Sequence, residues 1–229
     1  MEQYAGVLAV VDTSSSMTKK TPDGETRLEV AKRSVNKLAE TLLGQNTSDN
    51  PDAANMALLA FNKTTYYHSL GWTNDLSTYK RAVKKLKHHV GINWEMTLRD
   101  ALEIANERSA QTGRPVYVIF ATDGNPTQTI AGGPDGWPGE AESYAAACPW
   151  AKDIVDAGYK LYTVEIYGTV SNLQDLTNYA YTGDDGMTTP GFCNRGFHGR
   201  RHGFDSPYGR PADGRPASHL RCGLCLYTE

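Results

Sequence analysis

Short apolar runs alternate with amphipathic stretches over residues 1–167 of the chain. Four runs are almost continuously apolar, as strands covered on both faces require, and they span residues 4–11, 55–61, 115–121 and 160–167. Between these runs, apolar residues recur every three or four positions, which predicts helices over residues 27–43, 75–86, 94–108 and 141–157. The alternation predicts an α/β fold, in which helices flank a doubly wound and mostly parallel sheet.

Composition and charge narrow the class of protein. Hydrophobic residues make up 39% of the 229 residues and charged residues 21%, which is the balance of a globular chain with a sizeable core. The formal charge of −3 is too small to indicate a polyanionic partner, and the basic run from Lys80 to His89 has the spacing of a solvated helix face. We therefore expect no nucleic-acid partner. No apolar stretch reaches the roughly 18 residues of a membrane span, so we also expect no transmembrane segment.

Polar residues follow two of the predicted strands, at the edge where open parallel sheets bind their ligands. Asp12, Ser14 and Ser16 alternate along the turn after the first strand, and Asp123 follows the third apolar run. A loop wrapped around a point would direct these oxygens inward, and Mg²⁺ prefers oxygen ligands. Two aspartates would also roughly neutralise a divalent ion. Each loop taken alone is equally typical of ordinary turn and N-cap residues, so both interpretations stay open on this evidence.

Three segments, VVDTSSSM, INWEMTLRDAL and FATDGNPT, resemble the metal-site loops of von Willebrand factor A (vWA) domains. The similarity spans residues 4–186, and RLEVAK and GYKLYTVEIYG are most similar to bacterial surface and pilus-associated members. The resemblance implies a Rossmann-like vWA fold with a metal-ion-dependent adhesion site. It implies Asp12, Ser14 and Ser16 as ligands from the first loop and Asp123 from the third. The implied cofactor is Mg²⁺, with Mn²⁺ or Ca²⁺ as alternatives.

The second loop departs from the family pattern at one ligand position. Related members have a threonine where this chain has Ile92, directly before Asn93, Trp94 and Glu95. An isoleucine has no oxygen to offer a metal ion. Thr97 lies inside the predicted helix and is expected to point elsewhere, whereas Asn93 is a candidate substitute through its side-chain carbonyl. The sequence therefore predicts a weakened metal site, whose metal binding depends on a partner being present.

The resemblance implies a non-enzymatic adhesion module that binds a protein ligand, such as a host or matrix protein, through an acidic side chain. The chain carries no Gly-x-Ser-x-Gly, phosphate-loop or His-Glu-x-x-His motif, so we expect no catalytic residues. The alternative is an intracellular scaffold domain that assists an ATPase or chelatase-type assembly. As part of a longer secreted protein, the module would be extracellular or at the cell surface. A natural start at Met1 would make it cytoplasmic.

The composition changes near residue 190, which divides the chain into an expected vWA-like domain (residues 1–189) and a tail (residues 190–229). The tail has no Val, Ile, Lys or Met, and it contains six arginines, seven glycines and four prolines. It offers no amphipathic stretch for the further helix with which family members usually close the sheet, so we expect that helix to be missing. A disordered tail and a tail read out of frame both remain as interpretations.

The cysteines leave a second question open in the same region. Cys148 stands alone in the expected domain, which predicts a body free of disulfides. The other candidate metal ligands lie in the tail: Cys193, His198, His202, Cys222 and Cys225. They fit no common zinc-finger spacing. A zinc cluster, a disulfide among these cysteines and an unstructured tail therefore stand side by side as hypotheses.

Overall fold

Strands and helices alternate along the computed structural model, which describes residues 5–130, 140–168, 173–183 and 193. The strands are β1 (Ala5–Asp12), β2 (Ala54–Phe61), β3 (Thr65–Thr73), β4 (Val116–Thr122) and β5 (Lys160–Glu165). The helices are α1 (Arg27–Leu43), α2 (Leu76–Lys85), α3 (Trp94–Thr112), α4 (Glu140–Asp156) and α5 (Leu173–Thr182), with a 3₁₀ turn at Ser15–Thr18. Every strand and helix predicted from the sequence is confirmed, with ends that shift by a few residues.

The strands of the described part form one five-stranded sheet in the order β3-β2-β1-β4-β5. β1 pairs in parallel with β2 and β4, β4 pairs in parallel with β5, and β3 runs antiparallel to β2. The register sets Val11 of β1 beside Ala121 of β4, so Asp12 and Thr122 end their strands at the same edge. The predicted α/β fold is confirmed, and its carboxyl edge brings the first and third loops together.

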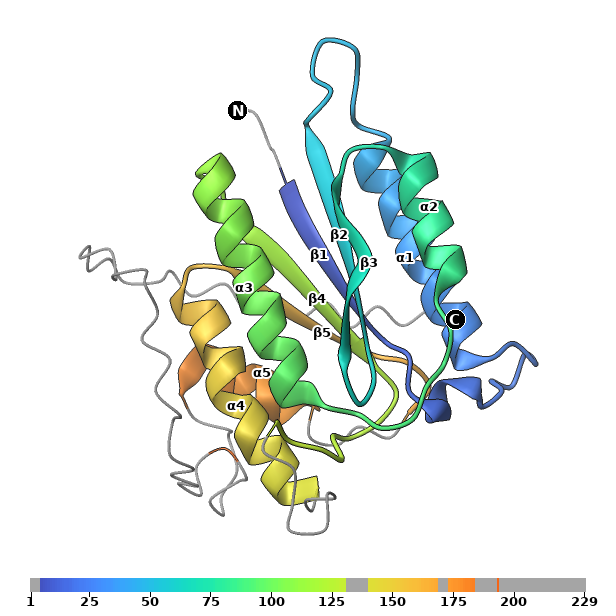
Figure 1. Cartoon of the computed structure of the whole chain (residues 1–229), viewed down its shortest axis with the longest axis vertical. Helices are drawn as coiled ribbons and strands as arrows, with labels where there is room; N and C mark the ends of the chain where they lie inside the picture. The colour runs from blue at the N-terminus through green and yellow to red at the C-terminus, as the bar shows by residue number, and fades with distance from the viewer. Residues whose placement is uncertain (1–4, 131–139, 169–172, 184–192, 194–229) are drawn as a thin grey trace. The chain divides into compact units, whose positions relative to one another are not determined.

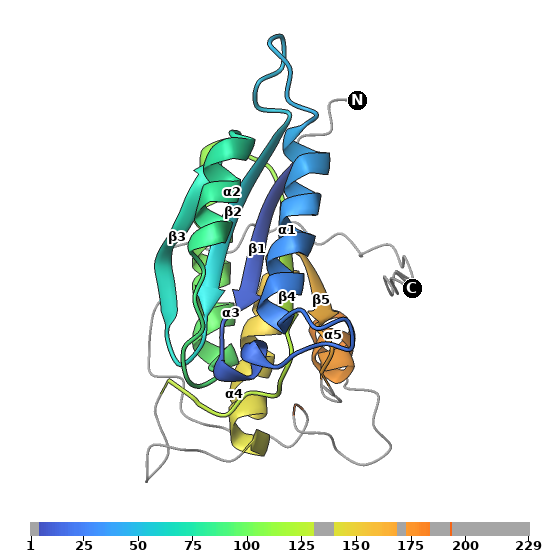
Figure 2. The ribbon, with the colours of Figure 1, turned by 90° about the vertical axis from the view of Figure 1, so that its right-hand side faces the viewer.

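Helices cover both faces of the sheet, as Figure 1 and Figure 2 show from two directions. α1 and α2 lie on the face that carries Val7, Ala9 and Val11 of the central strand, whereas α3, α4 and α5 lie on the face of Leu8 and Val10. Because β1 and β2 are buried on both faces, their sequences are continuous apolar runs. Removing apolar surface from water stabilises such a core by about 25 cal/mol per Å².

Local signals determine where the helices nearest the carboxyl edge begin. Thr26 and Glu29 form a capping box at the start of α1, in which each side chain accepts from the backbone N–H of the other. Asn93 caps α3, because its side-chain oxygen accepts a hydrogen bond from the N–H of Met96 at 3.0 Å. A local signal also marks the end of α4. Gly158, two residues after this helix, has a φ of +89°, which confirms the predicted left-handed cap.

Two elements, β3 and α5, are not among the strands and helices predicted from the sequence. β3 lies at an edge of the sheet, and its register against β2 shifts at two places. An irregular edge strand needs no continuous apolar run, so the sequence gives only a weak signal for it. α5 is a short helix that buries Leu173, Leu176 and Ala180, and this helical spacing is the signal that identifies it.

A disulfide joins Cys148 of α4 to Cys193, with 5.6 Å between the two Cα atoms. The prediction of a body free of disulfides is therefore wrong. Cys193 belongs to the same compact unit as α4, and it comes within reach of Cys148 only after the chain has passed α5. Because its sulfur is bonded to Cys148, Cys193 is also unavailable as a zinc ligand. The other members of the suggested zinc cluster, at positions 198, 202, 222 and 225, lie outside the described residues.

Contacts group Met1–Phe197 into one compact unit and His198–Glu229 into another. The second unit and residues 184–192 lie outside the described residues. The expected boundary near residue 190, the nature of the tail and the missing final helix therefore stay predictions. None of the described helices is both long enough and apolar enough to cross a bilayer.

Candidate functional site

Asp12 is the last residue of β1, and it is completely buried at the carboxyl edge of the sheet. One carboxylate oxygen accepts a hydrogen bond from the backbone N–H of Ser14 at 2.6 Å, which stabilises the turn after the strand. The other oxygen accepts a hydrogen bond from the hydroxyl of Thr122 at 2.5 Å. Both donors are neutral, and within the described residues no ion pair reaches Asp12. Asp12 is thus a buried carboxylate without a positively charged partner.

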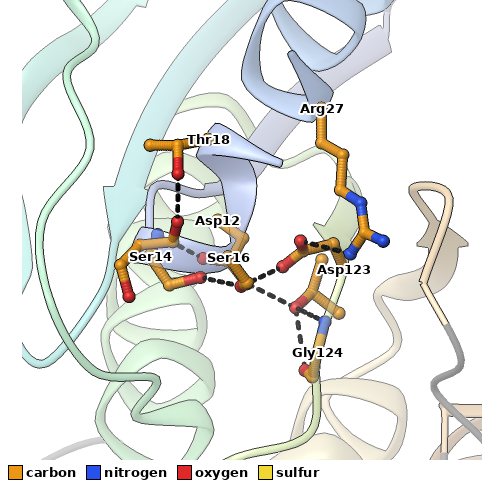
Figure 3. A network of polar contacts seen from close by, with 9 residues as sticks. Asp12, Ser14, Ser16, Thr18, Arg27, Asp123 and Gly124 are labelled. Atoms are coloured by element: carbon orange, nitrogen blue, oxygen red, sulfur yellow. Dashed lines mark hydrogen bonds and ion pairs between the residues drawn. The ribbon is translucent and has the colours of Figure 1, made fainter. Parts of the chain in front are cut away.

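The hydroxyls of Ser14 and Ser16 face each other beside this carboxylate. Their Oγ atoms are 2.8 Å apart, and Figure 3 draws this contact as part of a polar network. Ser14 is at the N-cap position of the 3₁₀ turn, yet its side chain makes no capping hydrogen bond. The interpretation of Ser14 as an ordinary N-cap residue therefore does not describe this loop. Its hydroxyl belongs to a polar cluster instead.

Asp123 follows β4 and completes the cluster from the third loop. One carboxylate oxygen accepts a hydrogen bond from the hydroxyl of Ser16 at 2.6 Å. The other accepts from the Nη1 group of Arg27 at 2.8 Å, which is an ion pair between the third loop and the first residue of α1. The structure therefore brings together all four residues that the sequence singled out, and Ser14 and Ser16 link Asp12 to Asp123.

Sequence reasoning did not include two members of the cluster, Thr122 and Arg27. Thr122 precedes Asp123 directly and ends the same strand, so its position after the apolar run carried a usable signal. Arg27 comes from the start of α1, beyond the first loop, and no motif spacing connects it to Asp123. Only the packing of α1 against the sheet brings its guanidinium to the site.

The second loop approaches the site with an apolar side chain. Ile92 is 7% exposed, and its Cδ1 atom lies 3.0 Å from the position that a Cβ atom would take on Gly124. Asn93, suggested as a substitute ligand, uses its side-chain oxygen to cap α3. Thr97 donates its hydroxyl to the backbone carbonyl of Asn93 at 2.5 Å, so it points along its own helix as expected. The second loop thus has no free side-chain oxygen at these three positions.

The electrostatics of Asp12 reflect its burial. Removal from water raises its pKa from the ordinary value of 3.8 to about 7, and the nearby charge of Asp123 acts in the same direction. Hydrogen bonds from Thr122 and Ser14 oppose this effect, because they favour the ionised carboxylate. Holding Asp12 ionised at neutral pH therefore carries a cost that a nearby cation would offset.

In EDTA, we expect the free energy of unfolding to fall as the pH rises from about 4 to about 7. The pKa of Asp12 is higher in the folded state than in the unfolded state. Asp12 therefore keeps its proton in the folded protein over this pH range but loses it in the unfolded chain. The resulting stabilisation is lost as the pH rises through the folded-state pKa of Asp12. The slope reaches at most about 1.4 kcal/mol per pH unit. Urea denaturation at several pH values measures it. Asp12→Asn, which cannot titrate, should lack this slope, and an unchanged slope would contradict the assignment.

The residues of this cluster have the chemistry of a hard-cation site. Their side chains offer only oxygen, from two carboxylates and from hydroxyls, and Mg²⁺, Mn²⁺ and Ca²⁺ all accept such ligands. Asp12 is buried and has no positively charged partner among the residues that the structure describes, so the site can accommodate further positive charge. Within the described part, no group of three or more His, Cys, Asp or Glu side chains is arranged to hold a metal ion. An ion bound here would therefore depend on the serine hydroxyls as well as the carboxylates.

Comparison with solved structures agrees with this fold. The vWF domain of the type V pili tip protein Mfa5 from Porphyromonas gingivalis has 15% identity and a TM-score of 0.60, covering 79% of this chain and 87% of that one. The PilB minor pilin from Streptococcus sanguinis has 16% identity and a TM-score of 0.59, covering 81% and 56%. The manganese-loaded TRAP protein of Plasmodium vivax has 16% identity and a TM-score of 0.50, covering 78% and 63%. At these identities the similarity shows the fold alone.

The chain spans only part of several of these proteins, and it covers 20% of a structure of three N-terminal domains of Mfa5. No curated protein matches it. The family model described as the von Willebrand factor type A domain matches residues 7–125, a segment of 119 of the 229 residues that includes Asp12, Ser14, Ser16 and Asp123. More than half of the chain is covered, and the chain therefore belongs to the von Willebrand factor type A domain family.

Proposed function

We propose that this domain is a non-enzymatic adhesion module that binds a protein partner at the carboxyl edge of its sheet through a divalent metal ion. The observation that supports this best is the convergence of oxygens from two loops. Ser16 contacts Ser14 at 2.8 Å and Asp123 at 2.6 Å, and Asp12 lies in the same network without a cationic partner in the described part of the chain. Mg²⁺ is the expected ion, with Mn²⁺ or Ca²⁺ as alternatives.

In this proposal Asp12, Ser14, Ser16 and Asp123 hold the ion, directly or through water. The bound ion supplies an electrophilic position that can accept a carboxylate from the partner. Ile92 contributes no oxygen at the second loop, which leaves the ion with fewer protein ligands than the family pattern provides. One solved neighbour, the TRAP protein, was obtained with manganese, which supports divalent-metal binding by this fold.

Exposed apolar side chains on nearby loops support a protein partner. Val90, Ile130 and Tyr167 are 64%, 39% and 47% exposed. Val90 follows His89, whose N–H donates to the carbonyl of Thr13 in the first loop at 2.7 Å. Exposed apolar side chains near a binding site are groups that a protein partner can remove from water. A macromolecular partner could cover them, whereas a free ion could not.

The location that fits this function is the cell surface or the extracellular space. The Cys148–Cys193 disulfide supports it, because stable disulfides form mainly in oxidising compartments. The similarity in fold to pilus proteins points in the same direction. No observation favours the alternative of an intracellular scaffold beside an ATPase or chelatase.

A phage-displayed peptide library tests the proposed function directly. The library is panned on the immobilised domain in Mg²⁺ and eluted with EDTA. We expect the eluted peptides to be enriched in Asp or Glu, to lose binding in EDTA, and to bind neither Asp12→Ala nor Ser14→Ala. Peptides that bind equally well in EDTA and to Asp12→Ala would rule out the metal bridge.

Replacing Ile92 with threonine is expected to tighten Mg²⁺ binding, on the order of tenfold, because it adds a hydroxyl where the family supplies a ligand. The matched control is Ile92→Val, which has nearly the same shape as threonine but no oxygen. Ile92→Val removes one methylene from a core side chain and should lose about 1 kcal/mol of stability, and Ile92→Thr should lose more because it also buries a hydroxyl. Isothermal titration with Mg²⁺ measures the affinity. Equal affinities for the threonine and valine variants would show that position 92 does not reach the ion.

A further inference from the structure

Arg27 places a positive charge inside the candidate site. It is the first residue of α1, directly after the capping Thr26, and its side chain is 17% exposed. The Nη1 group lies 2.8 Å from a carboxylate oxygen of Asp123, whose side chain is completely buried. The stick view in Figure 3 shows the guanidinium extending from α1 toward this carboxylate. The first residue of α1 thus places a positive charge beside the third loop.

The positive charge is not shared equally between the two carboxylates. Arg27 pairs with Asp123, whereas Asp12 accepts hydrogen bonds from neutral groups of Ser14 and Thr122 and, among the described residues, from no cation. The Nε atom of Arg27 is buried and has no hydrogen-bond partner in the described part of the chain. The side chain is therefore held at the site mainly by its ion pair with Asp123. Breaking a buried ion pair leaves an uncompensated charge, so each partner stabilises the position of the other.

We propose that Arg27 is a resident cation of the site, which holds Asp123 in place without a divalent ion and opposes the binding of one. This inference rests on the proposed function, because it concerns how the same site controls its metal. A divalent ion beside Asp123 must share that carboxylate with the guanidinium, and the two positive charges repel each other. Arg27 therefore weakens metal binding and holds the carboxylate of Asp123 in position.

A second consequence concerns the partner. With Asp123 already paired to Arg27, the site offers the ion only one carboxylate without a cation. An acidic side chain from a partner brings one further negative charge, which offsets the charge of Arg27. Metal and acidic partner should therefore bind cooperatively, each raising the affinity for the other by the same factor.

The test is a titration of the whole domain with Mg²⁺, and separately with Mn²⁺, by calorimetry. The variants are Arg27→Gln, which removes the charge, and Arg27→Lys, which keeps it. Arg33→Gln is the matched control, because Arg33 lies on the same helix but pairs with Glu25 at the surface. We expect Arg27→Gln to lower the dissociation constant for Mg²⁺ by at least about tenfold. Arg27→Lys and Arg33→Gln should stay close to the unchanged protein.

Thermal unfolding in EDTA gives a readout that does not depend on metal affinity. Arg27→Gln should melt at a lower temperature than the unchanged protein, because Asp123 is left without its partner. Adding Mg²⁺ should raise the melting temperature of Arg27→Gln by more than it raises that of Arg33→Gln. If Arg27→Gln does not fold, the guanidinium carbon resonance of Arg27 in the unchanged protein can be followed during a Mg²⁺ titration. An unperturbed resonance on saturation with Mg²⁺ would overturn the inference.

The outcomes separate this inference from the proposed function. Equal affinity of the unchanged protein and Arg27→Gln for Mg²⁺ overturns the role of Arg27 and leaves the metal bridge intact. Binding by Arg27→Gln alone supports the role of Arg27 and shows that the unchanged domain needs a partner to retain the ion. Absence of binding in every variant overturns both.

Discussion

Replacing Cys193 with serine is expected to lower the free energy of unfolding by about 4 kcal/mol, because the Cys148–Cys193 disulfide closes a loop of 45 residues. In the chain-entropy account, the cross-link stabilises the fold by restricting the unfolded chain. The bond also attaches the segment after α5 to α4, whose Cys148 side chain is buried in the core. Urea denaturation of the oxidised protein and of the Cys193→Ser variant gives the difference.

The experiment needs a background in which the other two cysteines cannot exchange. Cys222→Ser and Cys225→Ser supply it, because these are the remaining cysteines of the chain. In that background, dithiothreitol should destabilise the protein as much as Cys193→Ser does, and it should have no effect on the Cys193→Ser variant. Equal stability of the oxidised and reduced forms would contradict the cross-link, as would two free thiols in the oxidised protein.

Gly168→Ala is expected to disturb the third loop and weaken metal binding at the site. A Cβ atom on Gly168 would overlap the carbonyl group of Asp123 and stand 2.8 Å from its carbon atom. This neighbour is backbone, so the strain cannot be relieved by a side-chain rotation, and Asp123 must move. We expect a loss of about 1–3 kcal/mol in stability from overpacking. The displaced carboxylate should also weaken the binding of Mg²⁺.

Gly71→Ala is the matched control for this substitution. Gly71 lies in the edge strand β3, and a Cβ atom there meets no atom within 4 Å. Thermal unfolding and Mg²⁺ titration of the two variants separate a general effect of alanine from the displacement of Asp123. If Gly168→Ala kept the stability and the Mg²⁺ affinity of the unchanged protein, this result would contradict the close contact between Gly168 and the third loop.

The buried strands and the amphipathic helices could be predicted from the sequence because burial imposes a period on the chain. β2 is buried at every position, and α1 buries residues at three- and four-residue steps. β3 could not be predicted in this way, since an edge strand with register shifts is not required to be apolar throughout. The disulfide could not be predicted either, because the distance between Cys148 and Cys193 depends on tertiary packing and not on their spacing in the sequence.

The candidate site shows the same division. Asp12, Ser14, Ser16 and Asp123 could be singled out because each follows an apolar run at the carboxyl edge of the sheet. Asn93 could not be resolved from sequence alone, since its side chain serves either as a cap or as a ligand, and the hydrogen bond from Met96 shows the cap. Arg27 could not be found at all, because its contact with Asp123 depends on the packing of α1 against the sheet.

The central claim is that this cluster of oxygens binds a divalent ion, and thermal unfolding across a Mg²⁺ titration tests it most directly. The measurement is made above pH 7, where Asp12 is ionised, at constant ionic strength, on the unchanged protein and on a Ser14→Ala/Ser16→Ala variant. A ligand that binds only the folded state stabilises it by about 2.7 kcal/mol at 100 times its dissociation constant. We predict a saturable rise in melting temperature for the unchanged protein and no rise for the double variant. An equal response of the two proteins would contradict the claim, as would no response of either one together with no response of Arg27→Gln.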